Sequence, residues 1–514
     1  MARQRDVRTV LSRAPWGLKA PLVRVEVHLG AGLPTFVIVG LPEAVVRESK
    51  ERVRSALVTS GFDFPPGRIT VNLSPAELPK EGGRFDLPIA VAILAAGGQV
   101  PAHALDKREF YGELSLGGEL RHTPRLLPAL VEGSYSGREL ILPADNAVEA
   151  AFVRHPKIKL ARTLREVWTV LRGGTPPPPA TDLLVCKENC ATHLADRPEL
   201  ADVPDLAEVR GQFAAKRALE IAAAGEHGLL MIGPPGAGKT LLAQRLPGLL
   251  PPLTAADSLQ IASLESAAGR SLTLGARRPF RSPPHTASVA ALIGGGMRPG
   301  ELSLAHLGVL FLDELPEFAR NALEALREPL ESGVVQITRL KRSCEFPARF
   351  QLVAAMNPCP CGYAGDPRGR CHCTAEQVAR YRNRISGPLI DRIDIHLELM
   401  ALPVEQMLED SPAASEDSAT VGARVAAARQ LQLQRQGKLN ARLSPGEVTR
   451  HCRLGRDSRV LLGTAISRMG LSARACHRVM KLARTCADLA GEPMIRKIDV
   501  AEAAQLRALD RLIC

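Results

Sequence analysis

The sequence has few aromatic residues and no long apolar run. Phe, Trp and Tyr make up only 4% of the 514 residues, so stacking of nucleic-acid bases on aromatic side chains is not an obvious binding mode. No apolar run reaches the roughly 18 residues that a membrane-spanning helix needs, so no membrane partner is expected. The basic segment 1–13 is not followed by an apolar core, and a secretory signal is therefore not expected either.

The cysteines form no recognisable disulfide framework. Their number, 11, is odd, and the pattern fits a protein that stays reduced in the cytoplasm. The formal net charge of +12 favours a polyanionic partner, because Lys and Arg neutralise backbone phosphates of nucleic acids. An arginine-rich codon bias would give the same charge, so composition alone leaves both interpretations open.

Changes in composition divide the chain into regions. A chain of this length is too long for one hydrophobic core, so several domains are expected. Gly173, Gly174 and Thr175, followed by four prolines, predict a stiff linker, and a polar stretch at 409–420 sets off the last region. The predicted regions are 1–172, a Pro-rich linker at 173–202, 203–400 and 401–514.

Hydrophobic periodicity predicts an α/β protein. In the first region, strands at 22–29, 35–39 and 68–73 alternate with helices at 44–60 and 87–96, which predicts an α+β fold. In the middle region, apolar strands at 228–232, 309–312 and 350–355 alternate with helices, a pattern that favours a mainly parallel sheet. The last region is helical, for instance at 421–436 and 473–489.

A glycine-rich motif in the middle region predicts a nucleotide site. The motif consists of Gly233, Pro234, Pro235, Gly236, Ala237, Gly238, Lys239 and Thr240. It follows an apolar strand and opens a helix, which is the context that a phosphate-binding P-loop requires and a chance glycine-rich turn lacks. The loop's backbone N–H groups would surround the phosphates of ATP. Lys239 would reach the β- and γ-phosphates, and the Thr240 hydroxyl would ligate Mg²⁺.

Polar residues follow two further apolar strands of the same region. Asp313 and Glu314 end the strand at 309–312, and an ordinary strand end would account for them only if no P-loop preceded them. Asp313 suits the Mg²⁺ shell, and Glu314 suits polarisation of the attacking water. Asn357 ends the next strand and could bond the γ-phosphate or the water, or could instead cap a turn.

Four cysteines in one loop form a candidate metal site. Cys359, Cys361, Cys371 and Cys373 could bind a structural Zn²⁺ through four soft ligands. The C-x-C spacing is tighter than the usual C-x2-C knuckle, so reduced loop thiols are the alternative.

These motifs resemble the Mg-chelatase-like AAA+ ATPases of the YifB/ComM type. The matching stretches are 211–220, 278–281, 294–296, 299–306, 312–318, 356–362, 386–394 and 471–474. The resemblance covers nearly the whole chain and implies an AAA+ P-loop NTPase core with a C-terminal helical lid. The family usually has two consecutive histidines where this sequence has Pro284 and His285.

The resemblance implies roles for three more residues. Asn357 resembles sensor 1, and Arg474 resembles sensor 2, which reports the nucleotide state through the C-terminal helices. Arg392 resembles the arginine finger that is supplied to a neighbouring subunit, which implies a ring, a homo-hexamer. A guanidinium fork suits stabilisation of a transferring phosphoryl group. A surface salt bridge of Arg392 with Asp391 or Asp394 is the alternative.

An alternating segment at 334–346 turns at a basic tip and predicts a β-hairpin. In related ATPases such a hairpin projects into the ring pore. By this resemblance, Arg339, Lys341 and Arg342 would grip DNA phosphates, whereas a solvated charged turn is the alternative.

The first region resembles the Lon-protease-like domain of ChlI-type proteins, with its ribosomal-S5-type fold, at 79–88 and 112–115. Lon proteases need a Ser nucleophile and a Lys. Arg84 stands in the place of that serine, and the segment 118–130 contains no lysine. Peptidase activity is therefore not expected. The first region is instead expected to be an assembly or DNA-guiding module.

The function that the resemblance implies is an ATP-driven ring motor on single-stranded or branched DNA. A branch-migration helicase, acting in recombination of incoming DNA during natural transformation, is the leading form of this prediction. A chelatase ATPase subunit that drives Mg²⁺ insertion into a tetrapyrrole and an ATP-dependent protein remodeller are the alternatives.

Overall fold

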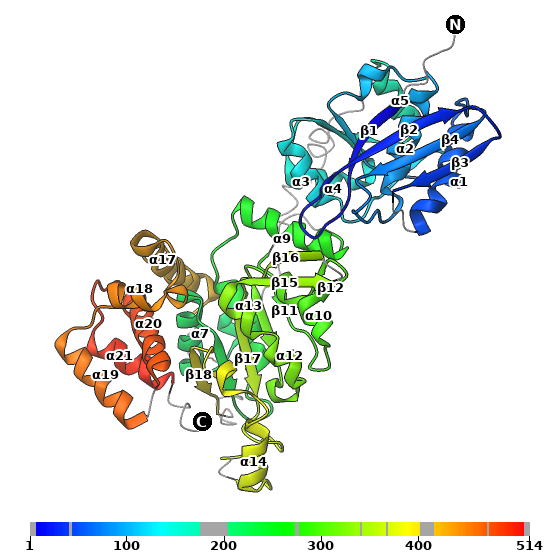
Figure 1. Ribbon diagram of the computed structural model, residues 1–514. Coiled ribbons are helices and arrows are strands. Elements are labelled where there is room, and N and C mark those ends of the chain that lie inside the picture. The colour runs from blue at the N-terminus through cyan, green and yellow to red at the C-terminus, as the bar shows by residue number, and fades with distance from the viewer. Residues whose placement is uncertain are drawn as a thin grey trace.

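The computed structural model describes residues 7–40, 44–174, 204–272, 277–339, 342–365, 368–400, 416–469 and 472–507. The predicted linker at 173–202 lies outside this part of the chain from residue 175 onward, and so does most of the polar stretch at 409–420. Among the residues that the structure describes, no helix is long and apolar enough to cross a membrane. Figure 1 shows a mixed α/β protein that ends in a group of helices.

The N-terminal region is built on a seven-stranded mixed sheet. Its strands, in spatial order, are β3 (Thr35–Val39), β4 (Arg68–Ser74), β2 (Leu22–Gly30), β1 (Arg8–Arg13), β5 (Arg108–Phe110), β8 (Glu139–Pro143) and β9 (Ile158–Ala161). Helix α2 (Asp86–Ala96) is buried at ten of its 11 residues, because it is apolar on every side and packs against β1 and β2. The predicted strands and helices of this region are confirmed, including α1 (Ala44–Thr59).

The middle region contains a five-stranded sheet in which every neighbouring pair is parallel. The spatial order is β11 (Phe280–Arg281), β14 (Val309–Leu312), β17 (Gln351–Met356), β10 (Leu229–Ile232) and β18 (Ile395–Glu398). Strands β10, β14 and β17 are buried throughout, as expected for strands covered on both faces. Because the strands are parallel, the carboxyl ends of β10, β14 and β17 meet at one edge of the sheet.

The predicted hairpin is present as β15 (Val334–Arg339) and β16 (Arg342–Pro347), paired antiparallel. Its inner face buries Val335, Ile337, Cys344 and Phe346, whereas the alternate residues between them are exposed. This alternation ties one face of the hairpin to the core of the middle region and leaves the other face open.

The C-terminal region is helical, as predicted. Its helices are α17 (Ser418–Gln436), α18 (Pro445–His451), α19 (Arg456–Met469), α20 (Ala473–Leu489) and α21 (Lys497–Gln505). In Figure 1 they form the orange and red group beside α7 (Phe213–Gly225) of the middle region. Their apolar side chains share one hydrophobic core with α7 and β10, so this helical group packs directly on the sheet layer.

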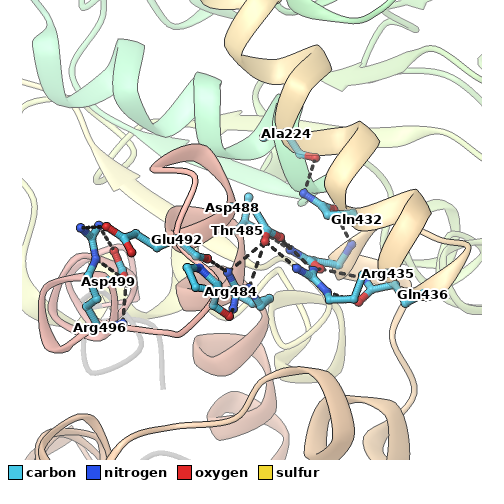
Figure 2. Close-up of polar contacts among 12 residues, drawn as sticks. Ala224, Gln432, Arg435, Gln436, Arg484, Thr485, Asp488, Glu492, Arg496 and Asp499 are labelled. Atoms are coloured by element: carbon cyan, nitrogen blue, oxygen red, sulfur yellow. Dashed lines mark hydrogen bonds and ion pairs between the residues drawn. The ribbon is translucent and has the colours of Figure 1, made fainter.

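A buried polar network fixes the helical group onto the middle region, as Figure 2 shows. Arg435 of α17 donates two hydrogen bonds to the Asp488 carboxylate of α20, at 2.6 and 2.9 Å. Gln432 donates to the carbonyl of Ala224 at the end of α7. His227 Nε2 lies 2.8 Å from Thr485 Oγ1. Buried polar groups are costly unless paired, so these bonds specify one orientation of α17 and α20.

Among the described residues, the N-terminal and middle regions touch at α9 (Ala255–Ala268) and at the hairpin. The Leu127 amide, at the start of α3 (Leu127–Tyr135), donates to Ser266 Oγ of α9 at 3.3 Å. The turn between β1 and β2 reaches the hairpin, where a Cβ on Gly17 would lie 2.0 Å from Cys344 Sγ. Gly17 has φ +60°, so glycine is required there both for space and for backbone conformation.

Candidate active site

The P-loop joins β10 to α8 (Lys239–Leu249) at the carboxyl edge of the sheet. Gly236 and Gly238 have φ values of 79° and 86°, in the left-handed region that favours glycine. This conformation turns the chain sharply from the strand into the helix, so that α8 begins at Lys239. The strand–loop–helix context expected for the motif is therefore present.

Lys239 is held between the P-loop and a neighbouring strand. Its ammonium group donates to the carbonyls of Gly233, at 2.6 Å, and Pro234, at 3.0 Å, and to Asn357 Oδ1, at 2.9 Å. Burial lowers the pKa of Lys239, whereas the nearby carboxylates of Asp313 and Glu314 raise it. The amine is thus placed where it can exchange these oxygens for phosphate oxygens.

Thr240 and Asp313 form a pair of oxygen ligands. The Thr240 hydroxyl, in the first turn of α8, donates to Asp313 Oδ2 at 2.9 Å. Asp313 directly follows β14, and its Oδ1 accepts a hydrogen bond from the Glu314 amide at 2.9 Å. A hydroxyl and a carboxylate at this separation fit Mg²⁺, which prefers hard oxygen ligands and keeps several waters.

Glu314 has an unusual backbone and an unexpected neighbour. Its φ is +51°, a conformation that a residue with a Cβ rarely adopts and that is often found at active sites. His285 Nδ1 lies 3.3 Å from Glu314 Oε2, and both side chains are about half exposed. The sequence had singled out His285 only as a departure from the family pattern, so this contact could not have been found from spacing.

Asn357 lies where sensor 1 was predicted. It directly follows β17, and its side-chain oxygen accepts the hydrogen bond from Lys239. The side chain therefore points toward the P-loop. Its catalytic role stays a prediction.

Arg392 lies just after α15 (Gly387–Ile390), and its side chain is 13% exposed. The guanidinium donates to the Pro388 carbonyl at 2.6 Å and forms an ion pair with Glu331. The alternative prediction, an ion pair with Asp391 or Asp394, therefore named the wrong carboxylate. Within the described ranges, no hydrogen bond or ion pair joins Arg392 to the P-loop of its own chain.

Asp394 has partners other than Arg392. Burial by itself would raise the pKa of Asp394, but Arg478 and His227 hold it well below its usual range. Arg478 of α20 bonds both the Asp394 carboxylate and the Arg392 carbonyl. The segment that carries Arg392 is thus attached to the C-terminal helices. Arg474, one turn earlier on α20, is exposed, and its predicted role as sensor 2 is not tested by any contact.

The four loop cysteines lie together. All four sulfur atoms are within 4.8 Å of one another, with Cys359–Cys361 and Cys361–Cys371 separations of 3.3 and 3.6 Å. Four sulfurs bound to one Zn²⁺ would lie about 3.8 Å apart. Backbone N–H groups of Tyr363 and His372 lower the pKa of the Cys361 thiol to about 6. The donor set and its geometry therefore fit a tetrahedral zinc.

The cysteine loop borders the P-loop. A Cβ on Gly362 would lie 2.8 Å from Pro235 Cδ, and the loop begins immediately after Asn357. The loop therefore lies against two elements of the predicted nucleotide site, a proximity that the spacing of the cysteines had not suggested.

The predicted DNA-contacting residues lie at the end of the hairpin. Arg339 and Arg342 are paired across the two strands at their last register position. Lys341 lies outside the described residues. The hairpin is confirmed, and its contact with DNA stays a prediction.

Arg84 is the residue that the resemblance to Lon-protease-like domains placed at the position of the catalytic serine. Arg84 is buried, and its guanidinium donates to the Pro124 carbonyl at 2.7 Å. Burial, together with the charge of Arg125, lowers the pKa of Arg84 to about 10, which leaves it cationic at neutral pH. A hydrogen-bonded guanidinium is not a nucleophile, so this position cannot supply the Ser/Lys chemistry of a peptidase.

Matches to known protein families fall on the N-terminal, middle and C-terminal regions separately. Three family models match: "Magnesium chelatase, subunit ChlI" at residues 205–407, "Subunit ChlI of Mg-chelatase" at 25–146, and "Magnesium chelatase, subunit ChlI C-terminal" at 415–507. The chain is 48% identical to competence protein ComM of Haemophilus influenzae over 98% of each chain. It is 45% identical to the uncharacterized protein YifB of Escherichia coli, over 98% of this chain and 97% of YifB. It is 41% identical to the uncharacterized protein Rv2897c of Mycobacterium tuberculosis over 96% of each.

Replacement of Glu314, the predicted general base, should separate nucleotide binding from hydrolysis. Glu314→Gln keeps the size of the side chain and leaves Lys239, Thr240 and Asp313 in place, so we expect ATP binding to remain. The hydrolysis rate should fall roughly 100-fold or more, because a general base contributes about 10²–10⁴. Equilibrium binding of a fluorescent ATP analogue and steady-state phosphate release measure the two effects. A variant that hydrolyses ATP at the wild-type rate would remove Glu314 from the catalytic role.

Proposed function

The chain belongs to the magnesium chelatase subunit ChlI family, in its YifB/ComM-type branch, and from this membership we propose that it is an ATP-driven motor acting on DNA. The observation that carries the ATPase part is the meeting of Lys239, Thr240, Asp313 and Asn357 through two hydrogen bonds. Such a site positions a triphosphate and its Mg²⁺ and places Glu314 beside the attacking water. ATP and Mg²⁺ are the cofactors of this proposal.

In this proposal the middle region is an AAA+ core and the C-terminal helices are its lid. The N-terminal region is a Lon-protease-like, ribosomal-S5-like domain without peptidase chemistry, and it assembles the motor or guides DNA. The contact of its β1–β2 turn with Cys344 of the hairpin supports a guiding role, because the turn braces the element that would hold DNA.

The active unit of this motor is a ring, a homo-hexamer, in which Arg392 acts on the nucleotide of the next subunit. In the part of the chain that the structure describes, Arg392 has no bond to its own P-loop and is held by Glu331 and Pro388. The half-site within one chain offers Lys239 as its cation, and charge on the transferring phosphoryl is commonly neutralised by an additional arginine. Exposed Arg474 would report the nucleotide state from the lid.

The DNA substrate is supported by two observations of different kinds. The relative from Haemophilus influenzae, matched over the full length, bears the name competence protein, and the net charge of +12 suits a polyanion. We therefore propose single-stranded or branched DNA as the substrate and branch migration, during recombination of incoming DNA in natural transformation, as the activity. The eight described cysteines are all free, in keeping with the cytoplasmic location that we propose.

Two alternative functions would require other partners than DNA. A chelatase subunit would drive Mg²⁺ into a tetrapyrrole together with partner subunits, and the family name is its support. A protein remodeller would show ATPase stimulation by unfolded protein. The hairpin with its basic tip favours DNA over both, since phosphates are the natural partners of clustered Arg and Lys.

We also propose that Cys359, Cys361, Cys371 and Cys373 bind one structural Zn²⁺. The metal would hold closed the loop that borders Pro235 and follows Asn357.

DNA should stimulate ATP hydrolysis, and the basic residues at the hairpin tip should determine how strongly DNA binding depends on salt. We expect single-stranded and branched DNA to raise the ATPase rate of the wild-type chain and to have no effect on Lys239→Ala. Replacement of Arg339, Lys341 and Arg342 by Gln should weaken DNA binding and lower the slope of log K against log salt by about two. Three lost phosphate contacts on a single strand contribute about 0.7 each.

A triple replacement of three exposed basic residues of the C-terminal region, Arg450, Arg453 and Arg459 by Gln, is the matched control and should keep the wild-type slope. Absence of DNA stimulation together with no DNA binding at low salt would contradict the proposed substrate. Stimulation by unfolded protein instead would favour the remodeller.

Purified protein should contain about one zinc per chain by direct metal analysis. Cys361→Ser and Cys371→Ser should each lose the metal and hydrolyse ATP more slowly, because the loop no longer supports Pro235 and Asn357. Cys476→Ser, a half-buried cysteine of α20, should keep both metal and activity. Wild-type protein without zinc and with all four thiols reactive would contradict the metal site.

A further inference from the structure

One strongly basic part of the middle region has no role in the hydrolysis or at the hairpin. Between residues 368 and 384 the chain carries five arginines and a single acidic residue, Glu376. This stretch runs from the second half of the cysteine loop through α14 (Ala375–Arg382) and ends just beyond that helix. We call it the α14 surface. A concentration of positive charge of this kind attracts a polyanion.

Helix α14 is capped firmly but packs little against the rest of the chain. It begins directly after the cysteine loop, where the Thr374 hydroxyl accepts from the Gln377 amide and the Gln377 side chain accepts from the Thr374 amide. Of the eight residues of α14, Tyr381 is the one that is buried. Helices in proteins are stabilised mostly by the packing of an apolar face. A capped helix that buries one side chain leaves the rest of its surface open to a partner.

A groove of about 690 Å³ lies beside α14. Its lining includes three exposed arginines, Arg320, Arg380 and Arg384. Glu376 and Glu317 lie in the same groove, each 2.7 Å from an arginine, Glu376 from Arg380 and Glu317 from Arg384. The side chains of these two pairs are between 43% and 81% exposed, and exposed ion pairs are weak. The arginines can therefore exchange these carboxylates for phosphates.

The side chains of the α14 surface favour a duplex over a single strand. Proteins that bind single-stranded DNA usually stack its bases on exposed aromatic rings. Here Phe318 and Tyr381 are buried, and the Arg370 guanidinium covers the Tyr363 ring at 4.2 Å. The surface instead offers guanidinium groups, among them the exposed Arg368, which suit the phosphates along the outside of a duplex.

The α14 surface and the hairpin lie at opposite edges of the central sheet, as Figure 1 shows. Strand β16 leads into β17 at its amino end, and the cysteine loop follows the carboxyl end of β17. A strand of six residues spans roughly 20 Å. DNA held at the hairpin and DNA held at α14 would therefore not compete for the same place.

We propose that the α14 surface binds the phosphate backbone of a duplex arm of branched DNA, as a second contact besides the hairpin. This inference rests on the proposed function, since it names where the paired part of that DNA substrate is held. Arg320, Arg368 and Arg380 donate to phosphates there without reading the base sequence.

Binding of a blunt DNA duplex to the full-length protein, measured by fluorescence anisotropy over a range of salt concentrations, tests the proposal. Arg320→Gln, Arg368→Gln and Arg380→Gln together should lower the slope of log K against log salt by about 2.7, because three phosphate contacts on B-DNA contribute about 0.9 each. The affinity for the duplex near physiological salt should fall at least about tenfold. Each single replacement should lower the slope by about 0.9, so the test does not depend on the stability of the triple variant.

Two comparisons make the result specific to this surface. The affinity of the triple variant for single-stranded oligothymidylate should stay at the wild-type level. The triple Gln variant of Arg450, Arg453 and Arg459 removes the same charge from exposed positions and should bind the duplex with the wild-type slope.

A wild-type duplex slope in α14-surface variants that keep the wild-type melting temperature overturns the inference. So does an assembly that falls apart while the affinity for the duplex is kept, because the surface would then bind a second copy of this chain. Failure of the proposed function looks different. In that case the wild-type chain binds neither single-stranded nor duplex DNA at low salt, whereas failure of this inference alone leaves stimulation of ATP hydrolysis by single-stranded DNA intact.

Discussion

The hydrogen bond from Lys239 to Asn357 joins two neighbouring strands of the central sheet at the point where the nucleotide would lie. It is possible only because β10 and β17 are parallel, so that both strands end at the same edge. The hydrogen bond from Thr240 to Asp313 likewise joins the start of α8 to the end of β14. Displacement of any one of these strands would separate the groups that bind phosphate and metal, so the chemistry depends on the register of the sheet.

The C-terminal helices are attached to this edge through polar contacts as well as through the shared core. Arg478 of α20 holds both Asp394 and the carbonyl of Arg392, and His227 connects Asp394 to Thr485. A rotation of α20 would therefore displace the segment that carries Arg392. In the proposed ring, these contacts would give a physical route from the C-terminal helices of one subunit to the arginine that it would offer to the next.

Local sequence patterns predicted the features that are determined by residues close together in the chain. The P-loop, the carboxylates after β14, Asn357 after β17, and the hairpin all follow from spacing and alternation, and their positions are confirmed. Contacts between residues far apart in the sequence were missed, because the spacing of residue types does not encode them. Arg392 pairs with Glu331, which lies 61 residues away. Gly17 meets Cys344 across two regions. His285 reaches Glu314 through the folding of a loop that carries no periodic signal.

If Arg392 completes the nucleotide site of a neighbouring subunit, one chain holds half of an active site, and mixing two inactive variants tests this arrangement. Lys239→Ala lacks the phosphate-binding amine, and Arg392→Ala lacks the finger, so each should be inactive alone. When the two are coexpressed with different tags and purified through both, we expect ATPase activity to return. In such a ring, some interfaces pair an intact P-loop with an intact Arg392. A mixed assembly that stays as inactive as its parents, or chains that never copurify, would contradict the claim.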